Sequence, residues 1–240
     1  MAVLAGIDLH KRYGQREVVC GVSPMVQQGE IVGLLGPNGA GKTTSFYMLT
    51  GIIKPSAGRV LLEDKDIGGW PLHERARVGI SYLPQESSIF RRLTVRQNLQ
   101  IIMEHTGFPK KEQKARADQL LEEFGLTRLE NSHAMHLSGG ERRRLEIARA
   151  LIRDPKFVLL DEPFAGIDPL AVGDIQMLVR ELKNRGIGVL ISDHNVRETL
   201  TICDRAYLMY HGRVILSGTP DEIVSNEKAR EVYLGEDFSL

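Results

Sequence analysis

The sequence predicts an α/β fold in which a helical segment interrupts the alternation of strands and helices. Three observations support this prediction. A short apolar run at residues 30–36 ends in glycine and leads into a helix-forming segment, the pattern of a buried strand, a tight loop and a helix. Beyond Pro155, strand-like and helix-like segments alternate. Between them, from about residue 94 to residue 154, the patterns are helical.

The first ninety residues are rich in strand patterns. Residues 30–36, 58–64 and 78–84 are short apolar runs bounded by turn residues, which favours buried strands. The pattern then changes, because Thr94 and Gln97 have the spacing of a capping box ahead of an apolar face. A second helix should end at Gly125, and a third should begin after Ser138.

Alternation returns in the last third of the chain. Residues 156–163 and 187–194 predict strands, and a helix between them should end at Gly186. A short helix is expected from about Asn195, followed by a hairpin that turns at His211 and Gly212.

Composition excludes several classes of protein. The 240 residues are 42% hydrophobic and 26% charged, with a formal net charge of +0, so bulk charge gives no support to a nucleic-acid partner. No apolar run is long enough to span a membrane, and the first residues lack the pattern of a signal peptide. Cys20 and Cys203 are far apart in sequence, and we interpret them as reduced thiols of a cytoplasmic protein.

The segment GPNGAGKT (Gly36–Thr43) matches the phosphate-binding pattern G-x-x-x-x-G-K-[ST] in full. Gly39 and Gly41 let the backbone curl so that its N–H groups point inward. Lys42 would place its charge on the β- and γ-phosphates, and the Thr43 hydroxyl can bind Mg²⁺. The predicted nucleotide-binding residues here are Gly36, Pro37, Asn38, Gly39, Ala40, Gly41, Lys42, Thr43 and Thr44.

Two carboxylates follow the apolar run FVLL. Asp161 should lie at the carboxyl end of a buried strand, where open parallel sheets bind ligands, and could hold Mg²⁺. Glu162 comes next and could polarise an attacking water. These residues predict a nucleotide hydrolase, and the absence of an N-K-x-D motif disfavours a GTPase.

Further motifs identify the kind of hydrolase, because their order resembles the ATP-binding-cassette (ABC) family over almost the whole chain. They are Tyr13 in KRYG (adenine stacking), Gln85 in YLPQE (Q-loop), Ser138, Gly139 and Gly140 in LSGGE (signature), Asp168 in FAGIDP (D-loop) and His194 in SDH (switch histidine). Glu141 stands where that family more often has glutamine. The resemblance implies a P-loop NTPase in one domain, residues 1–240, with a RecA-like core, an antiparallel β sub-domain and a helical sub-domain at about residues 87–154.

The resemblance also implies how these residues act. Gln85 would contact Mg²⁺ or the attacking water, and His194 would contact the γ-phosphate. The signature would complete the ATP site of a second copy, giving a head-to-tail homodimer with two composite sites. The run of Arg142, Arg143 and Arg144 has acidic neighbours, so we interpret it as a solvated, ion-paired face rather than a nucleic-acid site.

The partner that receives the work of ATP hydrolysis is expected to be a membrane subunit. The resemblance places its docking groove near Phe90, with Arg91 and Arg92 at the rim, although an ordinary surface loop explains these residues equally well. Within the family the chain is most similar to the ATPase subunits of lipopolysaccharide exporters, with branched-chain amino acid transporters as the alternative. The C-terminal residues Glu231, Tyr233 and Phe238 become candidates for the dimer interface, against the alternative of a loose amphipathic tail.

This resemblance implies a peripheral protein on the cytoplasmic side of the bacterial inner membrane that does not itself touch the transported substrate. Two other classes remain as alternatives. A soluble cassette protein acting on ribosomes or DNA usually has two cassettes or a long insertion, which this chain lacks. A nucleotide-binding regulator without turnover would not need Glu162 and His194.

Overall fold

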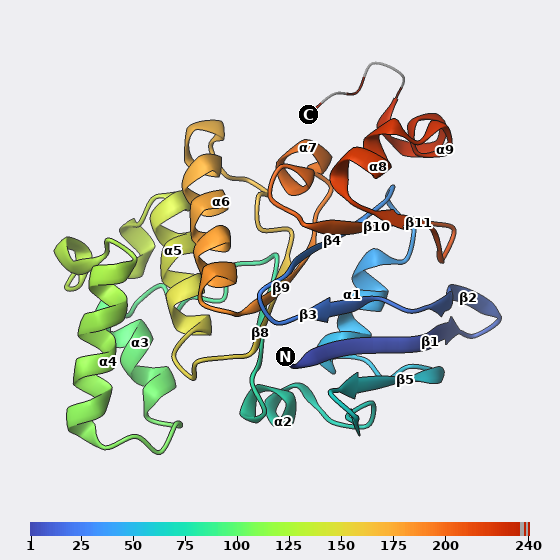
Figure 1. Cartoon of the computed structure of the whole chain (residues 1–240). Coiled ribbons are helices and arrows are strands. Elements are labelled where there is room, and N and C mark those ends of the chain that lie inside the picture. Colours follow the sequence, from blue (N-terminus) through green and yellow to red (C-terminus); the bar gives the residue numbers. More distant parts are fainter. Residues whose placement is uncertain (236–237, 239) are drawn as a thin grey trace.

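Two β-sheets form the core of the structure, and the first helix lies between them (Figure 1). The computed structural model describes residues 1–235, 238 and 240. The antiparallel sheet has the order β2-β1-β5-β6, with β3 paired to β1. Its strands are β1 (Val3–Tyr13), β2 (Arg16–Val22), β3 (Met25–Gln27), β5 (Ala57–Leu62) and β6 (Lys65–Asp66).

The second sheet has the order β11-β10-β4-β9-β8-β7, in which only the β10–β11 pair is antiparallel. Its strands are β4 (Ile31–Leu35), β7 (Ile80–Leu83), β8 (Phe157–Asp161), β9 (Gly188–Ser192), β10 (Arg205–Tyr210) and β11 (Arg213–Gly218). Because β4, β9 and β8 are parallel neighbours, the loops after them leave the same edge of the sheet. This topology brings together the three segments that carry the predicted phosphate, carboxylate and histidine groups.

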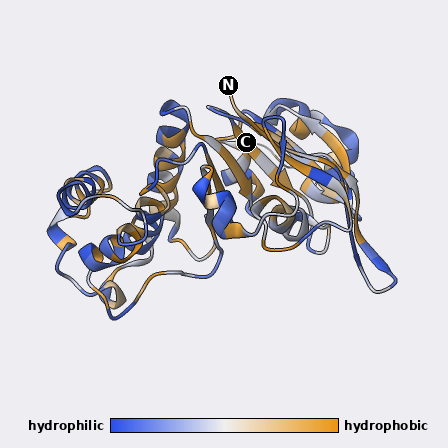
Figure 2. Cartoon of the chain, turned by 90° about the horizontal axis from the view of Figure 1, so that it is seen from below, coloured by the Kyte–Doolittle hydropathy of each residue, from blue (hydrophilic) through white to orange (hydrophobic). Residues whose placement is uncertain are grey.

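Helix α1 (Lys42–Thr50) contacts strands of both sheets. Its buried Phe46 and Met48 pack with Leu34 of β4 and Leu159 of β8 in one apolar cluster. In Figure 2 the strands of this core are mostly hydrophobic, whereas the outer helices on the left carry many hydrophilic residues. The start of α1, which follows the phosphate-binding loop, is therefore held by the core.

In sequence, three helices follow β7 and precede β8, and they lie at the left in Figure 1: α3 (Val95–Met103), α4 (Lys110–Glu123) and α5 (Gly139–Ala150). The capping box of Thr94 and Gln97 is present at the start of α3. Helix α4 ends just before Gly125, which has a left-handed backbone conformation, and Ser138 caps α5. These three predicted helix boundaries are therefore confirmed. Helix α6 (Pro169–Asn184) packs against α5. No helix within the described residues is both long and apolar enough to cross a membrane.

The remaining helices are short: α2 (Leu72–Arg77), α7 (Val196–Leu200), α8 (Pro220–Ser225) and α9 (Glu227–Ala229). The 3-10 turns are η1 (Thr127–Leu129) and η2 (Ala134–His136), and the turn η3 (Arg230–Leu234) is π-helical. Tyr233 and Phe238 pack against an apolar cluster that includes Leu35 and Leu208, while Glu231 is exposed. Glu236 and Asp237 of the same C-terminal segment lie outside the described residues.

Candidate active site

The phosphate-binding loop joins β4 to α1. Gly39 and Gly41 have φ angles of 79° and 98°, which glycine adopts readily. At Gly36 a Cβ atom would lie 2.2 Å from the carbonyl oxygen of Met209, so a side chain cannot be accommodated there. Because Gly41 caps α1 without a side chain, the first N–H groups of the helix are free of a side-chain cap and suit an anion.

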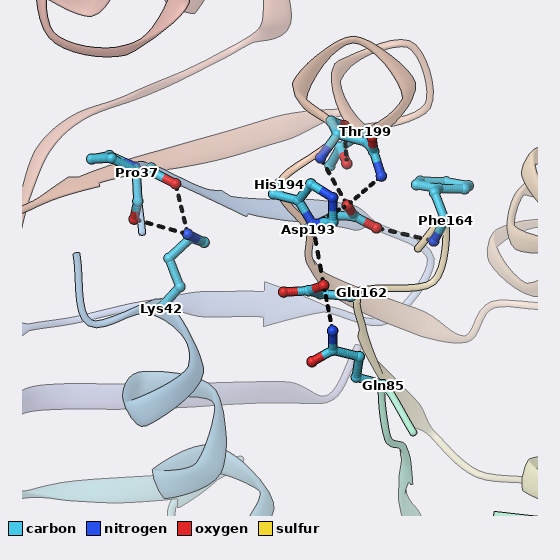
Figure 3. A network of polar contacts seen from close by, with 10 residues as sticks. Pro37, Lys42, Gln85, Glu162, Phe164, Asp193, His194 and Thr199 are labelled. Atoms are coloured by element: carbon cyan, nitrogen blue, oxygen red, sulfur yellow. Dashed lines mark hydrogen bonds and ion pairs between the residues drawn. The ribbon is translucent and has the colours of Figure 1, made fainter. Parts of the chain in front are cut away.

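Lys42 is only 8% exposed and its ammonium turns back over the loop (Figure 3). Its Nζ donates to the carbonyl oxygens of Gly36 at 2.6 Å and Pro37 at 3.0 Å. Burial lowers the pKa of Lys42, against the opposing charges of Glu162, Asp193 and Asp161. The ammonium thus has neutral acceptors that a phosphate oxygen, a stronger acceptor, can replace.

A pocket of about 250 Å³ surrounds the loop. Its walls are Asn38, Gly39, Ala40, Gly41, Lys42, Thr43, Thr44, Arg16, Val18 and Glu162. The sequence reasoning missed Arg16 and Val18, because only the pairing of β1 with β2 brings that hairpin to the loop. Tyr13 is 52% exposed at the end of β1, and its backbone pairs in register with that of Arg16, a residue of the pocket wall.

Glu162 is the centre of the predicted catalytic group (Figure 3). Gln85 Nε2 donates to Glu162 Oε2 at 2.8 Å, and His194 Nδ1 lies 3.1 Å from the same oxygen. The backbone of Glu162 has φ 46°, a strained region for a residue other than glycine, and its N–H donates to Ser192 at 2.6 Å. The structure therefore brings together three predicted residues from three separate loops.

Asp161 is 2% exposed at the end of β8. Burial, helped by the charge of Glu162, raises the pKa of Asp161 to about 6, although the Tyr82 hydroxyl donates to it at 3.4 Å. Such a crowded pair of carboxylates favours a bound cation. Oxygen groups of Asp161, Thr43 and Gln85 are the donors that Mg²⁺ prefers, so these residues fit the metal that the sequence predicts.

Asp193 supports both loops of the catalytic group, and the sequence reasoning missed it. Its buried carboxylate accepts the N–H of Phe164 at 3.0 Å (Figure 3). It also accepts the N–H of Asn195 at 2.8 Å. These bonds fix the segment after Glu162 and the segment after His194. An acidic residue directly after the buried run of β9 is the signal that could have identified it.

The signature residues lie apart from the phosphate-binding loop. Ser138, Gly139 and Gly140 line a second pocket together with Asp168, and no residue lining the loop pocket lines this one. Ser138 caps α5, whose N-terminus carries partial positive charge. The structure thus brings Asp168 to the signature. Gly139 also lines a pocket with Gln85 and Glu162 of the same chain, but among the described residues Ser138 and Gly140 line no pocket with the phosphate-binding loop.

The prediction of a solvated arginine run is wrong for Arg143, which is 5% exposed. Arg143 Nη1 pairs with Glu146 Oε2 at 3.0 Å and donates to the Pro84 carbonyl at 3.3 Å. Glu146 also accepts from Ser87 Oγ at 2.7 Å and from the N–H of Ser88 at 3.2 Å. The run was misread because the segment after β7 packs over this face of α5, a contact that no local pattern shows.

Phe90 is 44% exposed, and the Arg149 guanidinium lies 5.2 Å from its ring centre. Buried Asn98 accepts the Phe90 N–H at 2.8 Å and donates to the Phe90 carbonyl at 3.0 Å. Arg91 and Arg92 are exposed beside it. Asn98 thus holds the backbone here while the three predicted docking side chains are exposed, an arrangement that fits a docking groove and an ordinary surface loop equally well.

A phosphate-binding loop, a strand-end carboxylate pair and a separate helix-capping signature on this fold define a nucleotide-hydrolysing cassette. The family model "ABC transporter" matches residues 19–165, and the chain belongs to this family, so it is an ABC ATPase that binds nucleotide. A second model, "Branched-chain amino acid ATP-binding cassette transporter", matches residues 213–239.

Named relatives cover the full chain. It is 56% identical to the lipopolysaccharide export system ATP-binding protein LptB of Escherichia coli strain K12, and 52% identical to the LptB of Haemophilus influenzae, with 100% of both chains covered in each case. The solved ADP conformation of an ATP-binding cassette of an ABC transporter superposes with a TM-score of 0.88 at 32% identity, covering 98% of this chain and 100% of that one. The predicted family and fold class are confirmed.

Proposed function

We propose that this chain hydrolyses ATP to power a transporter that exports lipopolysaccharide from the bacterial inner membrane. The observation that supports ATP hydrolysis is the Glu162 carboxylate, held by Gln85 and His194 beside the phosphate-binding loop. The names of the full-length relatives support lipopolysaccharide as the cargo. The match of residues 213–239 to a branched-chain amino acid model favours the alternative cargo, but it covers only the C-terminal segment.

In this proposal the loop N–H groups and Lys42 hold the ATP phosphates, and the Tyr13 ring stacks on adenine. Mg²⁺, when bound by Thr43, Asp161 and Gln85, would neutralise phosphate charge. Glu162 accepts the proton of the water that attacks the γ-phosphorus, and the broken bond releases ADP. His194 contacts the γ-phosphate in this proposal. It also contacts the catalytic carboxylate, because its Nδ1 lies 3.1 Å from Glu162 Oε2.

The separation of the two pockets supports a composite site. One chain offers Lys42 and Glu162, and a second copy offers Ser138, Gly139 and Gly140, with Asp168 beside them. Two copies related head to tail then form two equal sites. ATP that contacts both copies favours the closed dimer, and hydrolysis removes that preference.

The surface around Phe90 supports a membrane subunit as the partner. Met135 is 56% exposed, and its N–H donates at 3.0 Å to the carbonyl of Arg91, the residue after Phe90, so a second exposed apolar residue is bonded to this segment. Two exposed apolar groups with a rim of arginine suit a short amphipathic helix with an acidic end. The chain then works at the cytoplasmic face of the inner membrane, without contact with nucleic acid or with the cargo.

The proposal is tested by exchanging Glu162→Gln and measuring ATP turnover and dimer formation. We expect an ATP-bound dimer with turnover reduced at least about 100-fold, as for loss of a general base. Undiminished ATP turnover in Glu162→Gln would show that Glu162 is not the general base. Affinity purification of the tagged chain from detergent extracts should recover membrane subunits, and a chain recovered alone would contradict the partner assignment.

A mixed dimer tests the composite site. A copy with Ser138→Arg is combined with a copy with Lys42→Ala, which leaves one composite site without either lesion. Activity in this mixture, compared with none in each variant alone, supports the shared site. If both sites remain inactive, the signature acts within its own chain.

A further inference from the structure

The signature serine is bound by a carboxylate of its own helix. Glu141 Oε2 accepts the Ser138 N–H at 2.8 Å and the Ser138 hydroxyl at 2.7 Å, and the Glu141 N–H donates back to Ser138 Oγ at 3.3 Å. Glu141 lines the same pocket as Ser138 and Gly140. The hydroxyl of Ser138 thus donates its hydrogen to Glu141.

Two other capping boxes in the described part of the chain show that capping does not require this arrangement. At α3 the partner of Thr94 is the neutral Gln97, whose Oε1 accepts the Thr94 N–H at 2.9 Å. At α8 the Glu222 carboxylate accepts the Thr219 N–H at 2.8 Å. Among the described residues, the box at α5 is the only one of the three in which the hydroxyl also donates to the partner's side chain.

We propose that Glu141 is a regulatory residue that raises the ATP concentration needed to close the dimer and speeds its reopening. The inference rests on the proposed function, in which the γ-phosphate of the partner's ATP meets Ser138. To donate to that phosphate, the Ser138 hydroxyl must withdraw its hydrogen from Glu141. The carboxylate then remains as a pure acceptor with a negative charge near a second anion.

Glutamine at this position would keep the cap and remove the penalty. Its Oε1 accepts the Ser138 N–H, as Gln97 does for Thr94, and its amide N–H groups can donate to phosphate. Unlike Ser138 and Glu162, Glu141 has no role in the proposed reaction. A change in closure without loss of the fold is therefore the expected consequence of Glu141→Gln.

The experiment uses the Glu162→Gln chain as the parent, so that ATP is bound and not consumed. Dimer formation is followed by sedimentation at increasing ATP for the parent, for the parent with Glu141→Gln, and for the parent with Glu222→Gln as the matched control. We expect Glu141→Gln to lower the ATP concentration at half-dimerisation at least about threefold, since one unit charge at several ångströms has this effect even in water. Dimer dissociation after ATP dilution should slow in proportion, while Glu222→Gln matches the parent.

The difference between Glu141→Gln and the parent should shrink in about 1 M NaCl, where charges are screened beyond ~3 Å. Equal midpoints, or a higher midpoint for Glu141→Gln, would overturn the inference, provided that thermal unfolding without nucleotide is the same for both. A parent that does not dimerise with ATP would instead overturn the proposed function. The two failures are thus distinguishable.

Discussion

Replacing Arg75 by methionine should destabilise the fold from a point remote from the reaction. Arg75 belongs to α2 and is 0% exposed. Its Nη1 donates to the carbonyl oxygens of Met48 at 2.8 Å and Leu49 at 2.6 Å, near the end of α1, and its Nε donates to Trp70 at 2.9 Å. One guanidinium thus joins the helix that begins at the phosphate-binding loop to the chain leading into α2.

The size of the effect follows from these bonds and from their cost. A hydrogen bond from a charged donor contributes about 1.5–3 kcal/mol. Four are lost with Arg75→Met, because Arg75 Nη2 also donates to the Gly68 carbonyl at 3.3 Å. Burial also disfavours the charge, because it lowers the pKa of Arg75 to about 10. The hydrogen bonds of Arg75 stabilise the fold by more than the burial of its charge costs. The carbonyl groups that lose their donor in Arg75→Met add a further penalty, so we expect the free energy of unfolding to decrease by about 3 kcal/mol.

For a chain of this length that loss corresponds to a decrease in melting temperature of roughly 6–12 °C. Urea unfolding and thermal unfolding without nucleotide measure it directly. Arg77→Met is the matched control, because Arg77 lies on the same helix and is exposed. If Arg75→Met lost less than about 1 kcal/mol, or no more than the control, the guanidinium would not be what holds the end of α1.

Three further predictions concern the site and its surroundings. Asp161 has a pKa of about 6 in the folded chain, above its ordinary 3.8, so the folded chain binds more protons than the unfolded chain between these pH values. The contribution of Asp161 to the stability of the fold should therefore decrease as pH rises through that window. Asp161→Asn should abolish this slope in thermal unfolding without nucleotide, and an unchanged slope would contradict the assignment. Glu146→Ala should cost about 3–5 kcal/mol in urea unfolding, because it leaves Arg143 buried without a carboxylate, and a loss under about 1 kcal/mol would refute this account. Phe90→Ala should leave the melting temperature nearly unchanged while reducing recovery of membrane subunits, and equal recovery would exclude Phe90 as an anchor.

Local chemistry explains what the sequence could predict. The spacing of the glycines and Lys42 fixes a phosphate-binding loop, and a buried run before Asp161 fixes its place at the end of a strand. Parallel strands then bring Asp161 and His194 to one edge without any knowledge of the packing. The phosphate-binding loop and the place of Asp161 needed only neighbours along the chain and the rules of parallel sheets, whereas the role of His194 was predicted from the resemblance to the ABC family.

Contacts between distant segments explain what could not be predicted. Arg143 looks solvated in sequence because its neighbours are charged, yet the segment after β7 covers it and supplies the Pro84 carbonyl as an acceptor. Asp193 looks like an ordinary acid before His194, and only the fold shows that it holds Phe164 across the site. The function of each charge depends on a partner more than twenty-five residues away.

The anchoring of the segment between β7 and α3 decides which contact should yield when a partner moves Phe90. Ser87 and Ser88 are bound to Glu146, which is buried with Arg143 on the signature helix. Gln85 is bound to Glu162 by one hydrogen bond from an exposed amide. Buried, charge-assisted networks resist rupture more than a single solvent-accessible bond. A displacement at Phe90 should therefore carry α5 and Ser138 with it, and break the contact between Gln85 and Glu162 first.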